Sequence, residues 1–185
     1  MLKTIVGDLR ANVHPGYPPR EYWAQVFGRL LLSPAVHCVI LYRLSSALYR
    51  RGPTRPLAFL LRGLSVVWGG TDIHPSARIG PELAILHSQK VTIGAGATIG
   101  ARARIAQGVT VSGDLGRHVA DEFQMPAIGD DVTLGVDSII LGPVTVGDKA
   151  AVGAQSLVTR DVPERAVVAG SPARVIRTLE ERHSA

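Results

Sequence analysis

The pattern of apolar and polar positions changes its period near residue 71. From there on, a large aliphatic residue recurs every six positions in three runs: Ile73, Ile79, Ile85; Ile93, Ile99, Ile105, Val111; Ile128, Leu134, Ile140, Val146, Val152, Val158. A period of six fits neither the 3.6-residue repeat of a helix nor the two-residue alternation of a strand. It is typical of a hexapeptide parallel β-helix, in which each hexapeptide forms one flat face of a coil and its aliphatic residue points inward.

The first 70 residues carry apolar positions at helical spacing instead. Helices are predicted over 21–32, after Pro18-Pro19, over 35–50, and over 56–68, before Gly69-Gly70. We therefore expect a mainly β protein in three parts: an N-terminal helical domain (1–70), a β-helix domain (71–170), and a polar C-terminal tail (171–185) with a short helix around 175–182.

The six-residue repeat breaks in two places. Ile85 and Ile93 are eight residues apart, so two extra residues bulge from a coil beside His87. Residues 113–126 are polar and without period, and this segment is predicted to be an extended loop at one corner. Because long loops in tight scaffolds usually carry function, we place the candidate chemistry at these two breaks.

His87 is the histidine at the first of these breaks. A neutral imidazole takes a proton from an alcohol or amine near neutral pH, and does so better when a carboxylate holds its other ring nitrogen. Asp72 lies fifteen residues earlier. In a coil of roughly eighteen residues the two side chains are out of register, although they could meet at a corner between adjacent coils. The alternative is a surface histidine that fills the bulge.

Arg117 and His118 lie in the loop. The arginine could bind a carboxylate or phosphate and the histidine could be a second base, or both could be solvated. A metal site is not expected, because the single cysteine, Cys38, has no CxxC partner and no HExxH motif occurs.

Composition and charge indicate which ligands, cellular location and membrane contacts are expected. The net charge of +5 comes without a dense basic block or interleaved aromatic residues, which argues against a nucleic-acid surface and suits a phosphorylated cofactor. One cysteine excludes an intrachain disulfide, and with no signal-peptide pattern a cytoplasmic location is expected. Membrane contact is not expected either, although a peripheral contact by residues 56–68 stays open.

Several segments resemble the serine acetyltransferase family of left-handed β-helix acyltransferases. These are the run Val36–Leu44, the entry motif Asp72-Ile73-His74-Pro75-Ser76-Ala77-Arg78-Ile79-Gly80, the motif Gln107-Gly108-Val109-Thr110-Val111-Ser112-Gly113, and the terminal motif Gly170-Ser171-Pro172-Ala173-Arg174-Val175. The entry motif and its distance to His87 are the more specific part, because hexapeptides alone are shared by many acyltransferases.

The resemblance implies a left-handed parallel β-helix, acetyl-CoA (or another acyl-CoA) as co-substrate, and a homotrimer or dimer of trimers with active sites between neighbouring subunits. It also implies that Asp72 orients His87, and that His87 deprotonates the acceptor hydroxyl as it attacks the thioester directly. The positions that match the cofactor-binding backbone of the family are Gly113, Gly135, Val136, Gly153 and Ala154.

The chain departs from the family pattern where the acceptor binds. Leu86 replaces an aspartate, Gln124-Met125-Pro126 replaces Arg-His-Pro, and His14-Pro15 stands near a family Asp-Pro. Losing a charged partner costs roughly 2–5 kcal/mol when the remaining charge is desolvated. We therefore expect the acceptor to be a less polar hydroxyl or amine compound, and not free L-serine. The residues expected to form its site are Leu86, Arg117, His118, Met125 and His14.

Two alternatives stay open. If Arg117 and His118 fold back into the pocket, the chain is a serine O-acetyltransferase of cysteine biosynthesis. The other alternative is a non-catalytic β-helix assembly subunit. The ending His183-Ser184-Ala185 differs from the isoleucine-terminated tail with which this family docks a partner synthase, which argues against that contact.

Overall fold

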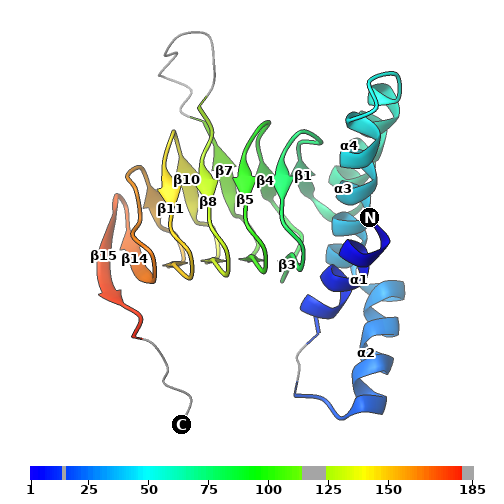
Figure 1. Ribbon diagram of the computed structural model, residues 1–185, viewed down its shortest axis with the longest axis horizontal. Coiled ribbons are helices and arrows are strands. Elements are labelled where there is room, and N and C mark those ends of the chain that lie inside the picture. The colour runs from blue at the N-terminus through cyan, green and yellow to red at the C-terminus, as the bar shows by residue number, and fades with distance from the viewer. Residues whose placement is uncertain (14–15, 114–123, 181–185) are drawn as a thin grey trace.

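A computed structural model of the chain describes residues 1–13, 16–113 and 124–180. Helices pack at one end of a stack of β-coils that extends away from them (Figure 1). The described part of the chain contains the helices α1 (Leu2–Ala11), α2 (Pro19–Leu32), α3 (Pro34–Tyr49) and α4 (Arg55–Gly69). The last three correspond to the predicted helices, whereas α1 was not separated from its surroundings by periodicity alone.

Local sequence signals set the helix ends. The Ser33 hydroxyl caps α3 by accepting a hydrogen bond from the Val36 backbone N–H at 3.5 Å, and Pro34 occupies the first helical position, where no N–H is needed. Helix α4 ends at Gly69 and is capped by Gly70, whose φ of 69° is left-handed and favours glycine. The chain therefore turns from α4 directly into the first strand.

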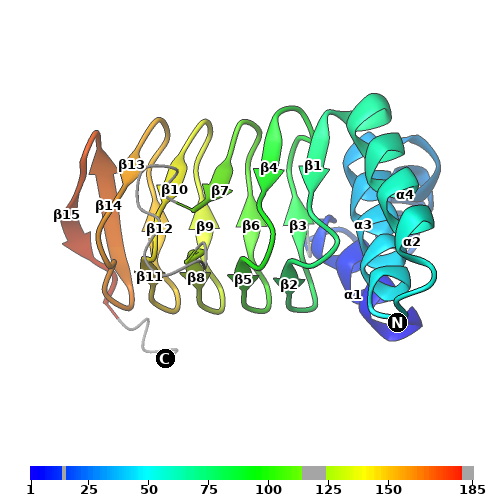
Figure 2. The same ribbon diagram turned by 90° about the horizontal axis from the view of Figure 1, so that it is seen from above.

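Three parallel sheets form the faces of the β-helix (Figure 2). The five-stranded sheet contains β1 (Thr71–Ile73), β4 (Val91–Ile93), β7 (Thr110–Ser112), β10 (Ile139–Leu141) and β13 (Leu157–Val158). The four-stranded sheet contains β2 (Arg78–Ile79), β5 (Thr98–Ile99), β8 (Ala127–Ile128) and β11 (Thr145–Val146). The six-stranded sheet contains β3 (Ala84–Ile85), β6 (Arg104–Ile105), β9 (Thr133–Leu134), β12 (Ala151–Val152), β14 (Ala166–Gly170) and β15 (Ala173–Thr178).

Strand register confirms both breaks in the repeat. Ile93 pairs with Val111, eighteen residues on, which is the regular coil length. Ile73 pairs with Ile93, twenty residues on, so the first coil holds the two extra residues beside His87. Val111 pairs with Ile140, twenty-nine residues on, and the additional length is the 113–126 segment between β7 and β8.

The core of the β-helix consists of the aliphatic residues that recur every six positions. All thirteen of them are buried and belong to one hydrophobic cluster. The small or β-branched residues four positions after them are buried as well: Ala77, Ala97, Ala103, Val109, Val132, Ser138, Val144, Ala150 and Ser156. The residues that recur every six positions are therefore the buried ones, and the predicted parallel β-helix is confirmed.

A buried ion pair joins the helices to the first coil. Arg43 of α3 donates from Nε to the Asp8 carboxylate of α1 at 2.8 Å, and its other nitrogens reach the carbonyl oxygens of Ile79 and Gly80, both at 2.6 Å. Asp8 also accepts the Leu83 backbone N–H at 2.9 Å. Because nearly every donor and acceptor is satisfied, this pair fixes α1 and α3 against the β2–β3 corner.

The C-terminal segment differs from the prediction. Instead of a helix around 175–182, β15 runs antiparallel to β14 as a hairpin across Gly170-Ser171-Pro172. Val175 and Ile176 are β-branched and favour a strand, and β14 offers an otherwise unpaired edge. The hairpin thus covers the last coil of the six-stranded sheet.

Helix α4 buries small residues and exposes large ones. Ala58, Ser65 and Gly69 are buried, whereas Val67 is 86% exposed and Trp68 60% exposed. Among the described helices none alone is long and apolar enough to cross a membrane; α2 and α3 pass that test only as a pair bent by 72°. A peripheral contact by residues 56–68 stays untested.

Candidate active site

Each corner between two sheets runs along the β-helix as an edge. The edge between the six-stranded and five-stranded sheets, here called the His87 edge, consists of residues 86–90, 106–109, 135–138 and 153–156. It contains the predicted base and four of the predicted cofactor-binding positions: His87, Gly135, Val136, Gly153 and Ala154. The candidate chemistry of both kinds therefore lies along one edge of a single chain.

His87 is exposed at this edge, between the buried residues Ile85 and Ser88. The Thr71 hydroxyl donates to the Ser88 carbonyl at 2.6 Å, which ties the two-residue bulge to the start of β1. Within the described residues the imidazole makes no side-chain hydrogen bond, so both ring nitrogens are accessible to a substrate. Leu86 beside it is 47% exposed and contributes an apolar surface.

Asp72 projects from β1 toward α4, since its neighbours Thr71 and Ile73 are buried. There the Arg62 guanidinium donates to both carboxylate oxygens, from Nε to Oδ1 at 2.5 Å and from Nη2 to Oδ2 at 2.9 Å. This hydrogen bond raises the pKa of Arg62. No hydrogen bond between Asp72 and His87 occurs in the described part of the chain, so the dyad stays a prediction, although the two residues come from adjoining segments.

Sequence reasoning missed Arg62. It is the one charged residue within the otherwise apolar stretch 57–68, and that contrast was the available signal. His74 lies in the same cluster. Its pKa is lowered by burial first and by the Arg62 charge second, and its ring packs edge-on against Tyr49 and Phe59.

Four of the predicted cofactor positions, Gly135, Val136, Gly153 and Ala154, form a track along the His87 edge on two successive coils. A Cβ added to Gly135 would lie 2.7 Å from the Ala154 backbone nitrogen and 2.8 Å from the Gly153 carbonyl carbon. A Cβ added to Gly153 would lie 3.0 Å from the Cβ of Ala169 on the next coil. These glycines therefore allow successive coils to pack closely at this edge, with backbone against backbone at Gly135.

Met125 lies on a different edge. Its terminal carbon packs over Gly94, where an added Cβ would meet it at 2.5 Å, and it is partly buried against the core. Gly113, also predicted to bind cofactor, is buried at the end of β7 on this same edge between the five-stranded and four-stranded sheets. One chain therefore does not bring Met125 and Gly113 to Leu86 and His87.

Three of the residues predicted to bind the acceptor lie outside the described residues. These are His14, Arg117 and His118. The residues next to His14 can be placed: Asn12 and Val13 end α1 against the first coil, where the Asn12 amide donates to the Leu83 carbonyl at 3.1 Å.

A groove of about 640 Å³ opens beside Leu86, and is here called the Leu86 groove. Its floor is the outer face of the six-stranded sheet, including Ala84 and Leu86. Its other wall comes from α1 and α2, with Asn12, Val13 and Tyr22. Leu86 and the residues that precede His14 thus line one groove, and the acceptor site stays a prediction.

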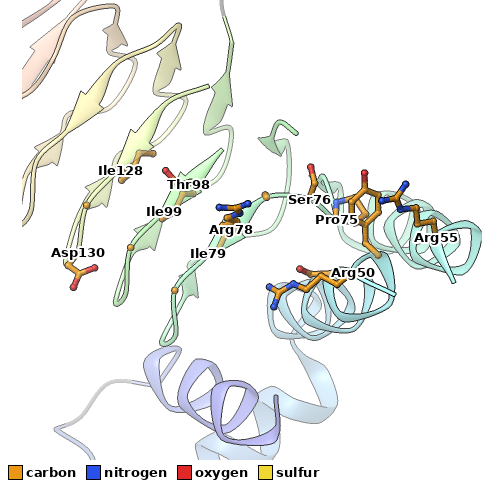
Figure 3. Close-up of a pocket in the computed structure, with 16 residues that line it drawn as sticks. Arg50, Arg55, Pro75, Ser76, Arg78, Ile79, Thr98, Ile99, Ile128 and Asp130 are labelled. Atoms are coloured by element: carbon orange, nitrogen blue, oxygen red, sulfur yellow. The ribbon is translucent and has the colours of Figure 1, made fainter. Parts of the chain in front are cut away.

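A second groove, of about 920 Å³, lies between the end of α3 and the outer face of β2, β5 and β8 (Figure 3). Arg50, Arg55 and Arg78 line it together with Thr98 and Asp130. None of its lining residues belongs to the His87 edge, so its size does not make it the active site. Among the described residues, no group of three or more His, Cys, Asp or Glu is arranged to hold a metal ion.

Comparison with known proteins agrees with this geometry. The family model described as a hexapeptide repeat of succinyl-transferase matches residues 90–114 and 127–160. The chain is 37% identical over 176 residues to serine acetyltransferase from Mycobacterium tuberculosis, covering 95% of this chain and 73% of the relative. It is 40% identical over 146 residues to Serine acetyltransferase 2 from Arabidopsis thaliana, covering 79% of this chain but only 44% of that longer relative.

The fold matches solved structures over nearly its full length. The crystal structure of serine acetyltransferase in complex with coenzyme A from Brucella abortus strain S19 superimposes with a TM-score of 0.85 at 29% identity, covering 97% of this chain and 68% of that one. Helices and coils are both included in the match. The hexapeptide core, the position of His87 at the bulged first coil and the identity across nearly the whole chain lead to one assignment: this chain belongs to the serine acetyltransferase family.

Proposed function

We propose that this chain transfers an acetyl group from acetyl-CoA to the hydroxyl of a small acceptor, with His87 as general base. One observation carries the proposal: in a member of the serine acetyltransferase family, the exposed imidazole and the Gly135–Gly153 track share one edge, beside the Leu86 groove. A thioester held along the track would reach His87 from one side, and an acceptor in the groove would reach it from the other.

The reaction needs only one base. A neutral His87 ring nitrogen takes the proton from the acceptor hydroxyl as the oxygen attacks the thioester carbonyl. The tetrahedral intermediate collapses by breaking the carbon–sulfur bond. The departing CoA thiolate then takes the proton from the His87 imidazolium. The products are the acetyl ester and free CoA, and no covalent enzyme intermediate forms.

Asp72 would stabilise the imidazolium. Its two oxygens offer about four acceptor sites, and Arg62 occupies two of them, so a further bond to His87 is chemically available. In this proposal Arg62 is a positioning residue that acts through Asp72.

We further propose that free L-serine is not the preferred acceptor. Leu86 offers no negative charge to an ammonium group, yet it lies next to the base and lines the groove. Since the relatives are named serine acetyltransferases, serine is the first compound that has to be compared.

We also propose a homotrimer, alone or as a dimer of trimers. Leu86 and Met125 occupy different edges of one chain, and an active site that uses both needs the loop edge of a neighbouring copy. Light scattering should give the mass of three or six chains; a monomer that turns over substrate would contradict this arrangement.

The test is release of thiol from acetyl-CoA by purified protein, with L-serine beside amino acids, amino sugars and hydroxylated small molecules. Turnover with a non-serine acceptor that disappears in His87→Ala supports the proposal. Fast turnover with serine would make the chain a serine O-acetyltransferase. No turnover with any acceptor, in a trimer that binds no acetyl-CoA, would favour the assembly subunit.

A further inference from the structure

The walls of the Leu86 groove are rich in arginine. Four arginines line it against two carboxylates: Arg10, Arg29, Arg102 and Arg104, with Glu82 and Asp131. The groove also combines elements far apart in the sequence, since Arg29 comes from α2 and Arg104 from β6. Its charge is therefore a property of the folded chain.

One of the two carboxylates, Asp131, is paired with Arg102. Arg102 donates to Asp131 from Nε at 2.7 Å and from Nη2 at 2.8 Å, and the negative charge of Glu82 also acts on it. This contact lowers the pKa of Asp131, which stays ionised and paired. Asp131 is therefore not free to receive a cationic group of a ligand, and Glu82 is the remaining carboxylate of the groove against three further arginines.

The charges of the other three arginines of the groove remain available to a ligand. The Cζ of Arg10 lies 5.4 Å from the centroid of the Trp23 ring. Because a neutral ring is its partner, the positive charge of Arg10 is not compensated by this contact. Arg29 and Arg104 are exposed, and neither has a carboxylate partner within the described residues. Arg104 lies beside Ala84 by strand register, on the sheet face that also carries Leu86. A ligand in this groove would thus touch an apolar floor and two unpaired guanidinium groups.

We propose that Arg29 and Arg104 bind an anionic group of the acceptor, so that the acceptor is a hydroxyl compound bearing a carboxylate or phosphate. Guanidinium groups bind both anions through paired hydrogen bonds, and Leu86 would cover the carbon skeleton. The groove volume suits a small ligand. This inference rests on the proposed acyl transfer and names the class of acceptor for that same site.

Matched acceptor pairs test it by turnover. Glycerol 3-phosphate is compared with glycerol, and glucuronate with glucose, by thiol release from acetyl-CoA. The anionic member of at least one pair should have a kcat/KM about tenfold or more higher, lost through KM in Arg104→Gln. Arg177→Gln, an exposed arginine on β15, is the control and should leave the ratio unchanged.

A binding measurement separates this inference from the proposed function. The same probes are titrated calorimetrically into CoA-saturated protein. Anion binding that depends on Arg104 without any turnover would uphold the groove assignment and reject the acyl transfer. Equal or better turnover of the neutral members, or a ratio unchanged in Arg104→Gln, would uphold the transfer and overturn the groove assignment.

A third outcome concerns the phosphates of the co-substrate. If Arg104→Gln weakens binding of CoA itself and leaves the acceptor pairs unaffected, the arginines serve CoA and the inference is overturned.

Discussion

Asp72 on β1 and Arg62 on α4 form a two-point ion pair, with nitrogen–oxygen distances of 2.5 and 2.9 Å. The pair joins the helical region to the first strand of the β-helix, three residues after α4 ends at Gly69. It also holds the aspartate that is predicted to orient His87. A residue outside the β-helix therefore fixes a group of the candidate active site.

Arg62→Met and Asp72→Asn should destabilise the protein weakly and non-additively. Their side chains are 30% and 34% exposed, so the pair should contribute about 1 kcal/mol or less to the free energy of unfolding. A double-mutant cycle by urea denaturation measures the coupling energy. Fully additive effects would mean that the pair contributes nothing to stability.

His74 should make stability depend on pH. Its pKa in the folded state is lowered, by burial first, so the unfolded chain binds more protons between the folded and unfolded pKa values. Stability is therefore complete above about pH 6.5 and falls as the pH decreases toward the folded value. The Ser76 backbone N–H donates to His74 Nδ1 at 3.1 Å, a bond that protonation of this nitrogen would break.

His74→Asn keeps an acceptor near Ser76 without titrating. Thermal unfolding at pH 7.5 and pH 5 should show a smaller decrease in Tm for this variant than for the wild type. An equal decrease in both would assign the pH dependence to other groups.

Asp8→Ala should be strongly destabilising. It leaves Arg43, 9% exposed, as a buried charge, and removes the acceptor of the Leu83 backbone N–H. Breaking such a pair costs about 3–5 kcal/mol. Asp131→Ala is the comparison, because its pair with Arg102 is solvent-exposed and its loss should destabilise the protein far less. Similar losses of unfolding free energy would contradict the role of the buried pair.

Gly135→Ala should reduce both stability and acetyl-CoA binding. The new Cβ would meet backbone atoms of Gly153 and Ala154 under 3.0 Å away, so the coils must separate, at a cost of about 1–3 kcal/mol. Gly28→Ala on α2 is the control: nothing lies within 4 Å of the added carbon, and a helical alanine should stabilise by about 0.5–1 kcal/mol. Unchanged CoA affinity in Gly135→Ala would place the cofactor elsewhere.

His87→Ala should lower turnover by a factor of about 10²–10⁴, the usual contribution of a general base. The unfolding midpoint should stay constant, because the side chain is exposed and makes no hydrogen bond among the described residues. Arg160→Ala, another exposed side chain, should retain full activity. Retained turnover in His87→Ala would remove the proposed base.

Much of the fold could be predicted because the β-helix depends on a repeat between residues that are close together in the sequence. A residue six positions from a buried aliphatic one occupies the same place on the next face, so Ile93 and Val111 identify their own register. The number of hexapeptides before each break also predicts the edge of the β-helix on which that break lies. The breaks at Leu86 and Met125 come after different faces, so they lie on different edges. The tail was mispredicted because β15 forms only when β14 offers it an edge.

The β-helix, its inward residues, the bulge at His87 and the insertion at 113–126 follow from the amino-acid pattern, because each depends on spacing along a single coil. The contacts between the helices and that coil arise only in the folded chain. The close packing of Gly69 against Cys38 sets the rotation of α4, and that rotation directs Arg62 at Asp72. The Leu86 groove likewise unites Arg29 with Arg104, seventy-five residues apart, through packing that no local pattern encodes.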